Sequence, residues 1–274
     1  QFGCIDVGDA DPLAAAADRV AVVNGRRHAK GGGSKNDRHG PEPSALARRD
    51  AALLDLRVFD SRGYTFAILL MATMMATLFG TIILLPIYLQ DVLSLDPAAV
   101  GLILLPGGLL MGLSGPIVGR WFDRFGARAL VVPGAIIVSI SLWGMAFLLT
   151  AEASWVMTLL CHIVLSLGLA LIFTPLFTSA LGSVKPHLYS HASAVLGTSQ
   201  QLSGAAGTAL FIVVFTIAEA GAQAGMAEPS ASAIGAGVHA AYLIGAVMSL
   251  AAVALAFFIE TPPVDDSQPA PSAH

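Results

Sequence analysis

The sequence predicts an all-α membrane protein with six transmembrane helices, and three observations carry this prediction. The chain of 274 residues is 55% hydrophobic and only 12% charged, whereas a soluble domain has about 25% charged residues. Six apolar stretches follow one another, each near the length of about 20 residues that crosses a bilayer. The Lys and Arg residues near them stand only on alternate connectors. A large soluble helical core is the alternative, but too little polar surface remains to cover it.

The expected spans form one transmembrane domain over 65–260, and none has Asp, Glu, Lys or Arg near its centre. They are 65–89, 98–118, 129–150, 155–181, 193–218 and 238–259. A basic lead-in over 51–64 precedes them, and a tail over 261–274 follows. Residues 1–50 are polar, Gly-rich and without a helix or strand period, which predicts disorder or a frame-shifted segment.

The positive residues predict the topology. Close to the spans, four arginines stand just before the first, three stand between the second and third, and one lysine stands between the fourth and fifth: Arg48, Arg49, Arg57, Arg62, Arg120, Arg124, Arg128 and Lys185. The other three connectors hold none. Because positive residues mark the cytoplasmic side, we expect a multi-pass protein of the cell membrane with both ends of the six-helix unit in the cytoplasm. The connector 220–237 is then a long outer loop.

The connector GRWFDRFGAR, residues 119–128, concentrates charge between two apolar spans. It holds Gly119, Asp123, Arg124, Gly126 and Arg128. A carboxylate beside a helix start is stabilised by free N–H groups and the helix dipole, and arginines pair with carboxylates or lipid phosphates. Anchoring of the topology alone needs the arginines but has no use for the aspartate. The pattern therefore favours a role in conformational change over anchoring alone.

Two spans carry stripes of small residues, which let membrane helices approach closely. In the second span these are Gly101, Gly108, Gly112, Gly115 and Gly119; in the fifth they are Ser193, Gly197, Gly204 and Gly207. We expect both stripes to pack against other helices. Gln200 lies on the same face as the second stripe, and Gln201 lies about 100° away around the helix.

Several polar residues inside the spans are candidates for lining a cavity. They are Thr73, Thr77, Pro175, Gln200 and Gln201. Each also has a structural reading: a glutamine can bridge two helices, and a threonine can bond its own helix at the i−4 carbonyl. Pro86 and Pro175 stand at matching places in the first and fourth spans, as in transporters whose helices are interrupted. His162 could carry protons, but a hydrogen-bonded packing role suits a lone histidine better.

No enzyme constellation is present, so the sequence predicts no catalytic residue. It contains no GxSxG, HExxH or nucleotide-binding loop. The two cysteines, Cys4 and Cys161, lie far apart and form no metal-ligand spacing. We expect no metal and no cofactor. The positive residues do not form a uniform basic face, so no nucleic-acid partner is expected.

The pattern Gly-x-x-x-Asp-Arg-x-Gly-x-Arg between two membrane helices resembles the signature loop of the major facilitator superfamily. LLDLRVF, PIYLQDVLSLDPAAVGLILLPGGL and SAVLGTSQQLSGAAGTAL resemble the C-terminal half of fourteen-helix drug/proton antiporters of the EmrB/QacA type. The resemblance covers about residues 51–262. It implies one half of a major-facilitator fold, made of two three-helix inverted repeats.

The resemblance also implies how the protein works. The first, second, fourth and fifth spans would face a central cavity, the third and sixth would face membrane lipid, and Asp123, Arg124 and Arg128 would help close the cytoplasmic side. The implied partners are protons and amphipathic or cationic small molecules, exported by alternating access. The spans hold no carboxylate for protons, so we expect it in a missing N-terminal half, without which the chain does not transport. A homodimer of this half, or a non-transporting scaffold or pseudogene product, is the alternative.

Overall fold

The computed structural model describes residues 56–149, 153–224 and 230–259. The chain divides into two compact units, 1–51 and 52–274, and all described residues belong to the second. The predictions for residues 1–50 and for the tail over 261–274 therefore lie outside the described residues.

The described residues are helical, as predicted. In chain order the elements are the 3₁₀ helix η1 (Leu56–Asp60), α3 (Arg62–Ile87), the π-helix η2 (Tyr88–Val92), α4 (Pro97–Leu113), α5 (Gly115–Phe125), α6 (Ala127–Leu148), α7 (Trp155–Gly182), the 3₁₀ helix η3 (Pro186–Leu188), α8 (Tyr189–Gln223) and α9 (Ala231–Ala256). Within the described ranges, five spans are long and apolar enough to cross a membrane, and α4 with α5 makes the sixth if the bent pair is one span. The all-α membrane fold is confirmed.

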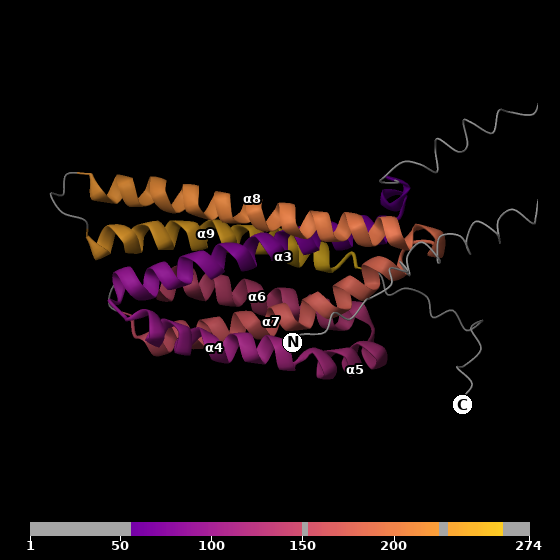
Figure 1. Ribbon diagram of the computed structural model, residues 1–274, viewed down its shortest axis with the longest axis horizontal. Coiled ribbons are helices and arrows are strands. Elements are labelled where there is room, and N and C mark those ends of the chain that lie inside the picture. The colour runs from indigo at the N-terminus through magenta and orange to yellow at the C-terminus, as the bar shows by residue number, and fades with distance from the viewer. Residues whose placement is uncertain (1–55, 150–152, 225–229, 260–274) are drawn as a thin grey trace, which may run out of the picture. The chain divides into compact units, whose positions relative to one another are not determined.

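The helices of this unit form two layers (Figure 1). In one layer α7 packs between α4 and α3, and α8 packs against the other side of α3. In the second layer α6 and α9 pack against each other; α6 also contacts α7, and α9 also contacts α3 and α8. The order α4, α7, α3, α8 thus places the first, second, fourth and fifth spans together, and the third and sixth spans behind them.

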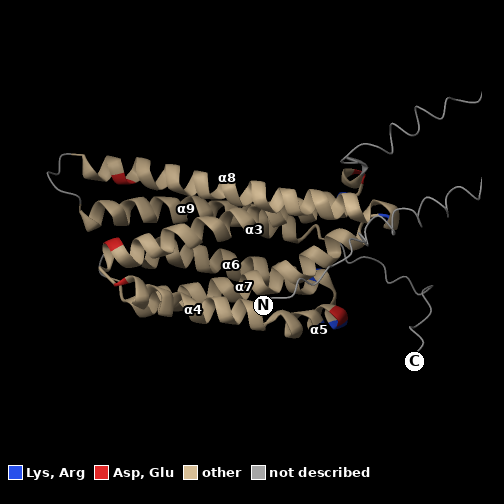
Figure 2. Cartoon of the chain, viewed as in Figure 1, with Lys and Arg blue, Asp and Glu red and all other residues tan. Residues whose placement is uncertain are grey.

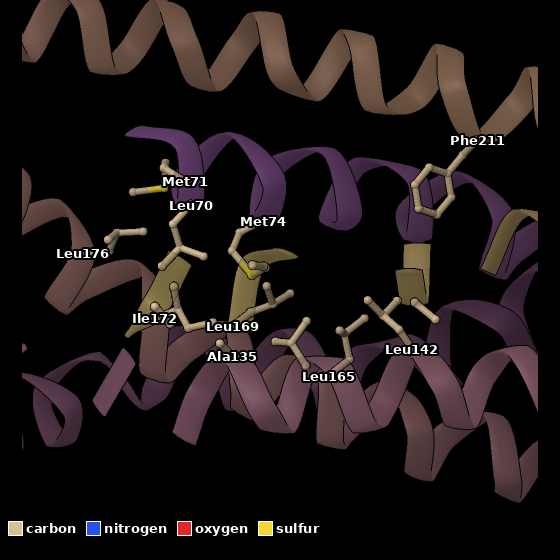
Figure 3. Packing of buried hydrophobic residues seen from close by; sticks show 14 of the residues in the cluster. Leu70, Met71, Met74, Ala135, Leu142, Leu165, Leu169, Ile172, Leu176 and Phe211 are labelled. Atoms are coloured by element: carbon tan, nitrogen blue, oxygen red, sulfur yellow. The ribbon is translucent and has the colours of Figure 1, made fainter. Parts of the chain in front are cut away.

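The core lies between α3 and the packed pair of α6 and α7. Leu70 and Met74 of α3 are fully buried, and Figure 3 shows them directed toward Leu169 and Ile172 of α7. Leu142 of α6 belongs to the same buried cluster. Since lipid tails are as apolar as these side chains, close packing rather than exclusion of water holds such a core together.

The second span is not the single straight helix that the sequence predicts. It breaks at Ser114 into α4 and α5, which differ in direction by 42°. Pro116 explains the break, because its ring excludes the carbonyl of the residue four positions earlier and it has no N–H to donate. The backbone instead closes a turn in which the N–H groups of Ile117 and Val118 both donate to the Ser114 carbonyl.

The basic segment 119–128 is also not a loop, which corrects the expectation of a connector there. It is helical as far as Phe125, and only Gly126 separates α5 from α6. Gly126 has φ 79° and ψ 172°, a backbone conformation that residues with a Cβ rarely adopt. One glycine therefore reverses the chain, and α6 begins at the very next residue.

A substitution at this turn tests its requirement for glycine. Gly126→Ala is expected to destabilise the bundle by about 1–3 kcal/mol, the cost of holding a non-glycine residue in this region. Gly119→Ala is the control, because Gly119 lies inside α5 and a Cβ there would meet no atom within 4 Å. Unfolding of both variants in mixed micelles, followed by tryptophan fluorescence, compares them. Equal stabilities would contradict the strained turn.

The predicted outer loop over 220–237 is much shorter in the structure. α8 continues to Gln223 and α9 begins at Ala231, because the alanines and Gln223 favour helix and Ser230 caps the new helix by accepting from the Ala233 N–H at 3.1 Å. The prolines interrupt less than predicted. Pro175 lies inside a continuous α7, and Pro86 lies inside α3 shortly before η2.

Candidate functional site

A pocket of about 330 Å³ lies between three helices of the first layer. α7 forms its floor, because α3 and α4 each pack on α7 and make little contact with each other. Leu165, Ser166, Leu169 and His162 come from α7; Leu78, Thr81, Ile82 and Leu85 come from α3; Leu104, Gly108 and Met111 come from α4. Since neither α6 nor α9 contributes a residue, the pocket opens on the face of the bundle away from them.

The pocket is apolar apart from three side chains, those of His162, Ser166 and Thr81. His162 and Ser166 stand four residues apart, so they share one face of α7. Gly107 of α4 makes room for both: a Cβ at that position would lie 2.5 Å from His162 Nε2 and 2.6 Å from Ser166 Oγ. The glycine thus seats α4 directly against the polar part of the floor.

Buried polar atoms surround this pocket without complete hydrogen bonding. Among the described residues, no partner is found for His162 Nδ1 or for the Thr77 hydroxyl, while the buried Thr158 hydroxyl lies beside that of Tyr88. The hydroxyls of Thr81 and Tyr242 are also buried and lie beside each other. A buried polar group without a partner costs about 1–3 kcal/mol. A further hydrogen bond to one of these unpaired atoms would therefore be stabilising.

The residues predicted to line a cavity do not meet at one place. Thr73 borders a second, shallower hollow between α3 and α8 and donates to the Leu69 carbonyl at 2.9 Å. Thr77 and Pro175 are buried. Gln200 is half-buried on α8 and Gln201 is exposed. Their placement in a cavity remains a prediction.

The two glycine stripes have different surroundings in this chain. Gly204 and Gly207 face α3, where a Cβ would lie 2.9 Å from the Phe79 ring and 2.5 Å from the Ala76 carbonyl oxygen, respectively. In the second span, a Cβ at Gly108, Gly112 or Gly115 would meet no atom within 4 Å among the described residues. Any packing partner of the stripe in the second span must therefore come from outside the described residues.

Charge gathers at the two ends of the helices (Figure 2). Among the described residues, one end has only Asp and Glu, and Lys and Arg are found at the opposite end together with Asp60 and Asp123. Asp123, Arg124 and Arg128 are exposed there, and the Arg124 guanidinium lies 5.3 Å from the centre of the Phe125 ring. No group of His, Cys, Asp and Glu that could hold a metal ion occurs in the described ranges.

Reasoning from the sequence missed most of this pocket. It singled out His162, but not Thr81, Ser166 or Gly107. The spacing of His162 and Ser166 was the available signal, since it puts two polar side chains on one helix face. Gly107 gave no signal, because its role depends on how α4 lies against α7.

Comparisons with known proteins place the chain among membrane transporters. A family model described as Major Facilitator Superfamily matches residues 20–208. The match therefore begins upstream of the sequence segments that resemble this family, which start at about residue 51. The lincomycin resistance protein LmrB of Listeria monocytogenes is 37% identical over 216 residues, 76% of this chain and 45% of that protein. The uncharacterized MFS-type transporter YcnB of Bacillus subtilis is 34% identical over 211 residues, 77% of this chain and 44% of that protein.

A third relative carries a multidrug name. The multidrug resistance protein B homolog of Mycobacterium tuberculosis is 32% identical over 170 residues, 62% of this chain and 32% of that protein. The chain thus spans less than half the length of these relatives.

Proposed function

Because this chain belongs to the Major Facilitator Superfamily, we propose that it is the C-terminal half of a fourteen-helix multidrug/proton antiporter. It exports amphipathic or cationic compounds by alternating access, in which two halves rock about a central cavity. It works as a multi-pass membrane transporter and catalyses no chemical reaction. Its substrates reach the cavity along the layer formed by α4, α7, α3 and α8.

The observation that carries this proposal is the uncovered glycine stripe of the second span. Gly108, Gly112 and Gly115 have open space where a Cβ would stand, although such stripes serve close helix packing in membranes. The relatives are more than twice as long as the part that matches this chain. Both facts support a missing N-terminal half that packs against α4 and α5.

The basic end of the bundle is cytoplasmic in this proposal, since positive residues concentrate on that side of a membrane. Asp123, Arg124 and Arg128 are exposed at this end, where they can pair with charges on the missing half. They close the cytoplasmic side in one state of the transport cycle and release it in the other. Proton coupling comes from a carboxylate on the missing half, because the described spans hold none near their centres.

Reconstitution tests the proposal. The chain is coexpressed with the N-terminal half of the Listeria monocytogenes LmrB protein, and proteoliposomes are assayed for efflux of the cation ethidium and for proton movement. The pair is expected to transport both, and the chain alone is expected to stay at the background of empty liposomes. Efflux and proton movement by the chain alone would overturn the need for a missing half.

A homodimer is the second candidate, because the open glycine stripe accepts another copy equally well. Cysteine crosslinking distinguishes a homodimer from a chain that packs against a missing N-terminal half. Gly112→Cys, in a background with Cys4→Ser and Cys161→Ser, would crosslink between copies only in a homodimer. An exposed control position, Ile136→Cys on α6, reports random collision in the membrane.

A further inference from the structure

We propose that the pocket between α3, α4 and α7 is a binding subsite within this half, for a fused two-ring aromatic group that carries one hydroxyl. The proposal deepens the proposed function and rests on it for the pocket's place in the transport path. The binding itself requires only residues of this chain.

The size of the pocket indicates the size of the ligand. Its volume is about 330 Å³, whereas an engineered apolar cavity of about 150 Å³ holds one benzene ring. Two fused rings therefore fit and three are crowded. The walls suit a flat apolar group, since Leu78 and Leu85 of α3 face Leu104 and Met111 of α4 across the Leu165 floor.

The polar side chains indicate one hydrogen-bonding group on the ligand. Ser166 is only 4% exposed and Thr81 only 2%, and both line the pocket together with His162. The His162 ring is hydrogen-bonded to the Leu104 backbone, and its buried Nδ1 has no partner among the described residues, so Nδ1 is the unused position of this imidazole beside the pocket. No Asp, Glu, Lys or Arg lines the pocket, so nothing there would compensate a charge on the bound group.

A lipid acyl chain is the competing occupant, because Ile82, one of the lining residues, is 53% exposed. An acyl chain would fill the apolar part but leave His162, Ser166 and Thr81 facing hydrocarbon. Unpaired polar groups in that environment are costly. The hydroxylated aromatic leaves fewer of them unpaired, which favours it over the acyl chain.

Gly108 allows the pocket to be filled without disturbing the bundle. It lines the pocket, and a Cβ there would meet no atom within 4 Å, so Gly108→Leu places its side chain into empty space. Gly101→Leu is the matched control. Gly101 lies two turns earlier on the same face of α4, has the same open surroundings and does not line the pocket.

The experiment measures binding of 1-naphthol, naphthalene and n-decane to the purified 274-residue chain in micelles. Calorimetric titration against empty micelles gives the dissociation constants, and the rise in Tm gives an independent measure. We expect 1-naphthol to bind, and Gly108→Leu to weaken binding by about tenfold or more while Gly101→Leu changes it by less than about twofold, because only the first occludes the cavity. Naphthalene should bind about fivefold to tenfold more weakly than 1-naphthol, the size of one neutral hydrogen bond.

Two further variants locate the polar contact. His162→Leu and, separately, Ser166→Ala should reduce the preference for 1-naphthol over naphthalene, while the Tm without ligand shows that each variant is folded. Absence of 1-naphthol binding, or equal binding to the Gly108→Leu chain, would overturn the subsite. Equal affinity for naphthalene would overturn the hydroxyl, and a Tm rise with n-decane matching that with 1-naphthol would assign the pocket to an acyl chain. These outcomes do not depend on whether the reconstituted pair transports.

Discussion

Replacing Gly207 with valine is expected to separate α8 from α3 and destabilise the bundle by about 3 kcal/mol, at the upper end of the usual cost of overpacking. A Cβ at this position would lie 2.5 Å from the Ala76 carbonyl oxygen and 2.6 Å from the Ala76 Cβ, and would meet the Ala76 Cα as well. These are mainly backbone atoms, which cannot rotate aside as the end of a long side chain can. Unfolding in mixed micelles, followed by tryptophan fluorescence, measures the loss.

Gly197→Val is the control for this prediction. Gly197 lies on the same helix, and a Cβ there would meet no atom within 4 Å. Its stability should stay within about 0.5 kcal/mol of the original, because only helix propensity changes. If both variants lose the same stability, the contact with Ala76 does not hold the two helices together.

Removing the Phe211 ring should have the second-largest effect. The ring is 1% exposed and extends from α8 toward Leu142 (Figure 3). It fills a notch left by two glycines: a Cβ at Gly80 would lie 2.5 Å from the ring, and one at Gly245 would lie 2.8 Å from it. Phe211→Ala leaves a cavity that neither glycine can fill, so we expect a loss of about 3 kcal/mol, the low end for buried phenylalanine.

The same substitution at an exposed phenylalanine isolates the effect of the notch. Phe177 on α7 is 41% exposed, and Phe177→Ala should cost less than about 1 kcal/mol, the usual scale for surface substitutions. A partial rescue is also expected: Gly245→Ala combined with Phe211→Ala should recover stability, although Gly245→Ala alone should lower it. A loss that is equal in the two phenylalanine variants would show that the notch is not tightly filled.

The helices followed from hydrophobic length, because a bilayer demands about the same apolar run of every span, whereas their grouping into layers followed from the resemblance to the major facilitator superfamily. The bend at Ser114 did not follow, although Pro116 was visible, since a proline in a membrane helix can be accommodated without a break. The helical state of the segment 119–125 was missed for a related reason. Its arginines and Asp123 suggested a loop, but charged side chains at a membrane surface are compatible with a helix that leaves the bilayer.

The candidate site was less predictable than the fold. His162 stood out because an imidazole is rare inside an apolar span. The residues around His162 could not be predicted in the same way. The pocket combines residues of α3, α4 and α7, and the hydrophobic pattern of each helix does not determine how the three helices are rotated relative to one another. The same limit applied to the glycines. Gly204 and Gly112 belong to similar stripes, yet the first contacts Phe79 and the second faces open space.

The bend at Ser114 has a mechanical consequence. It divides the second span into two rigid rods: α4 carries the pocket residues Leu104, Gly108 and Met111, and α5 carries Arg120, Asp123 and Arg124. α4 is seated on α7 through Gly107, and α5 packs on α6 and α7 through Val118. Under the proposed function, a change of angle at Ser114 would move the charged residues of α5 relative to the pocket residues of α4, so that closing the cytoplasmic side and releasing a bound molecule would be separate steps.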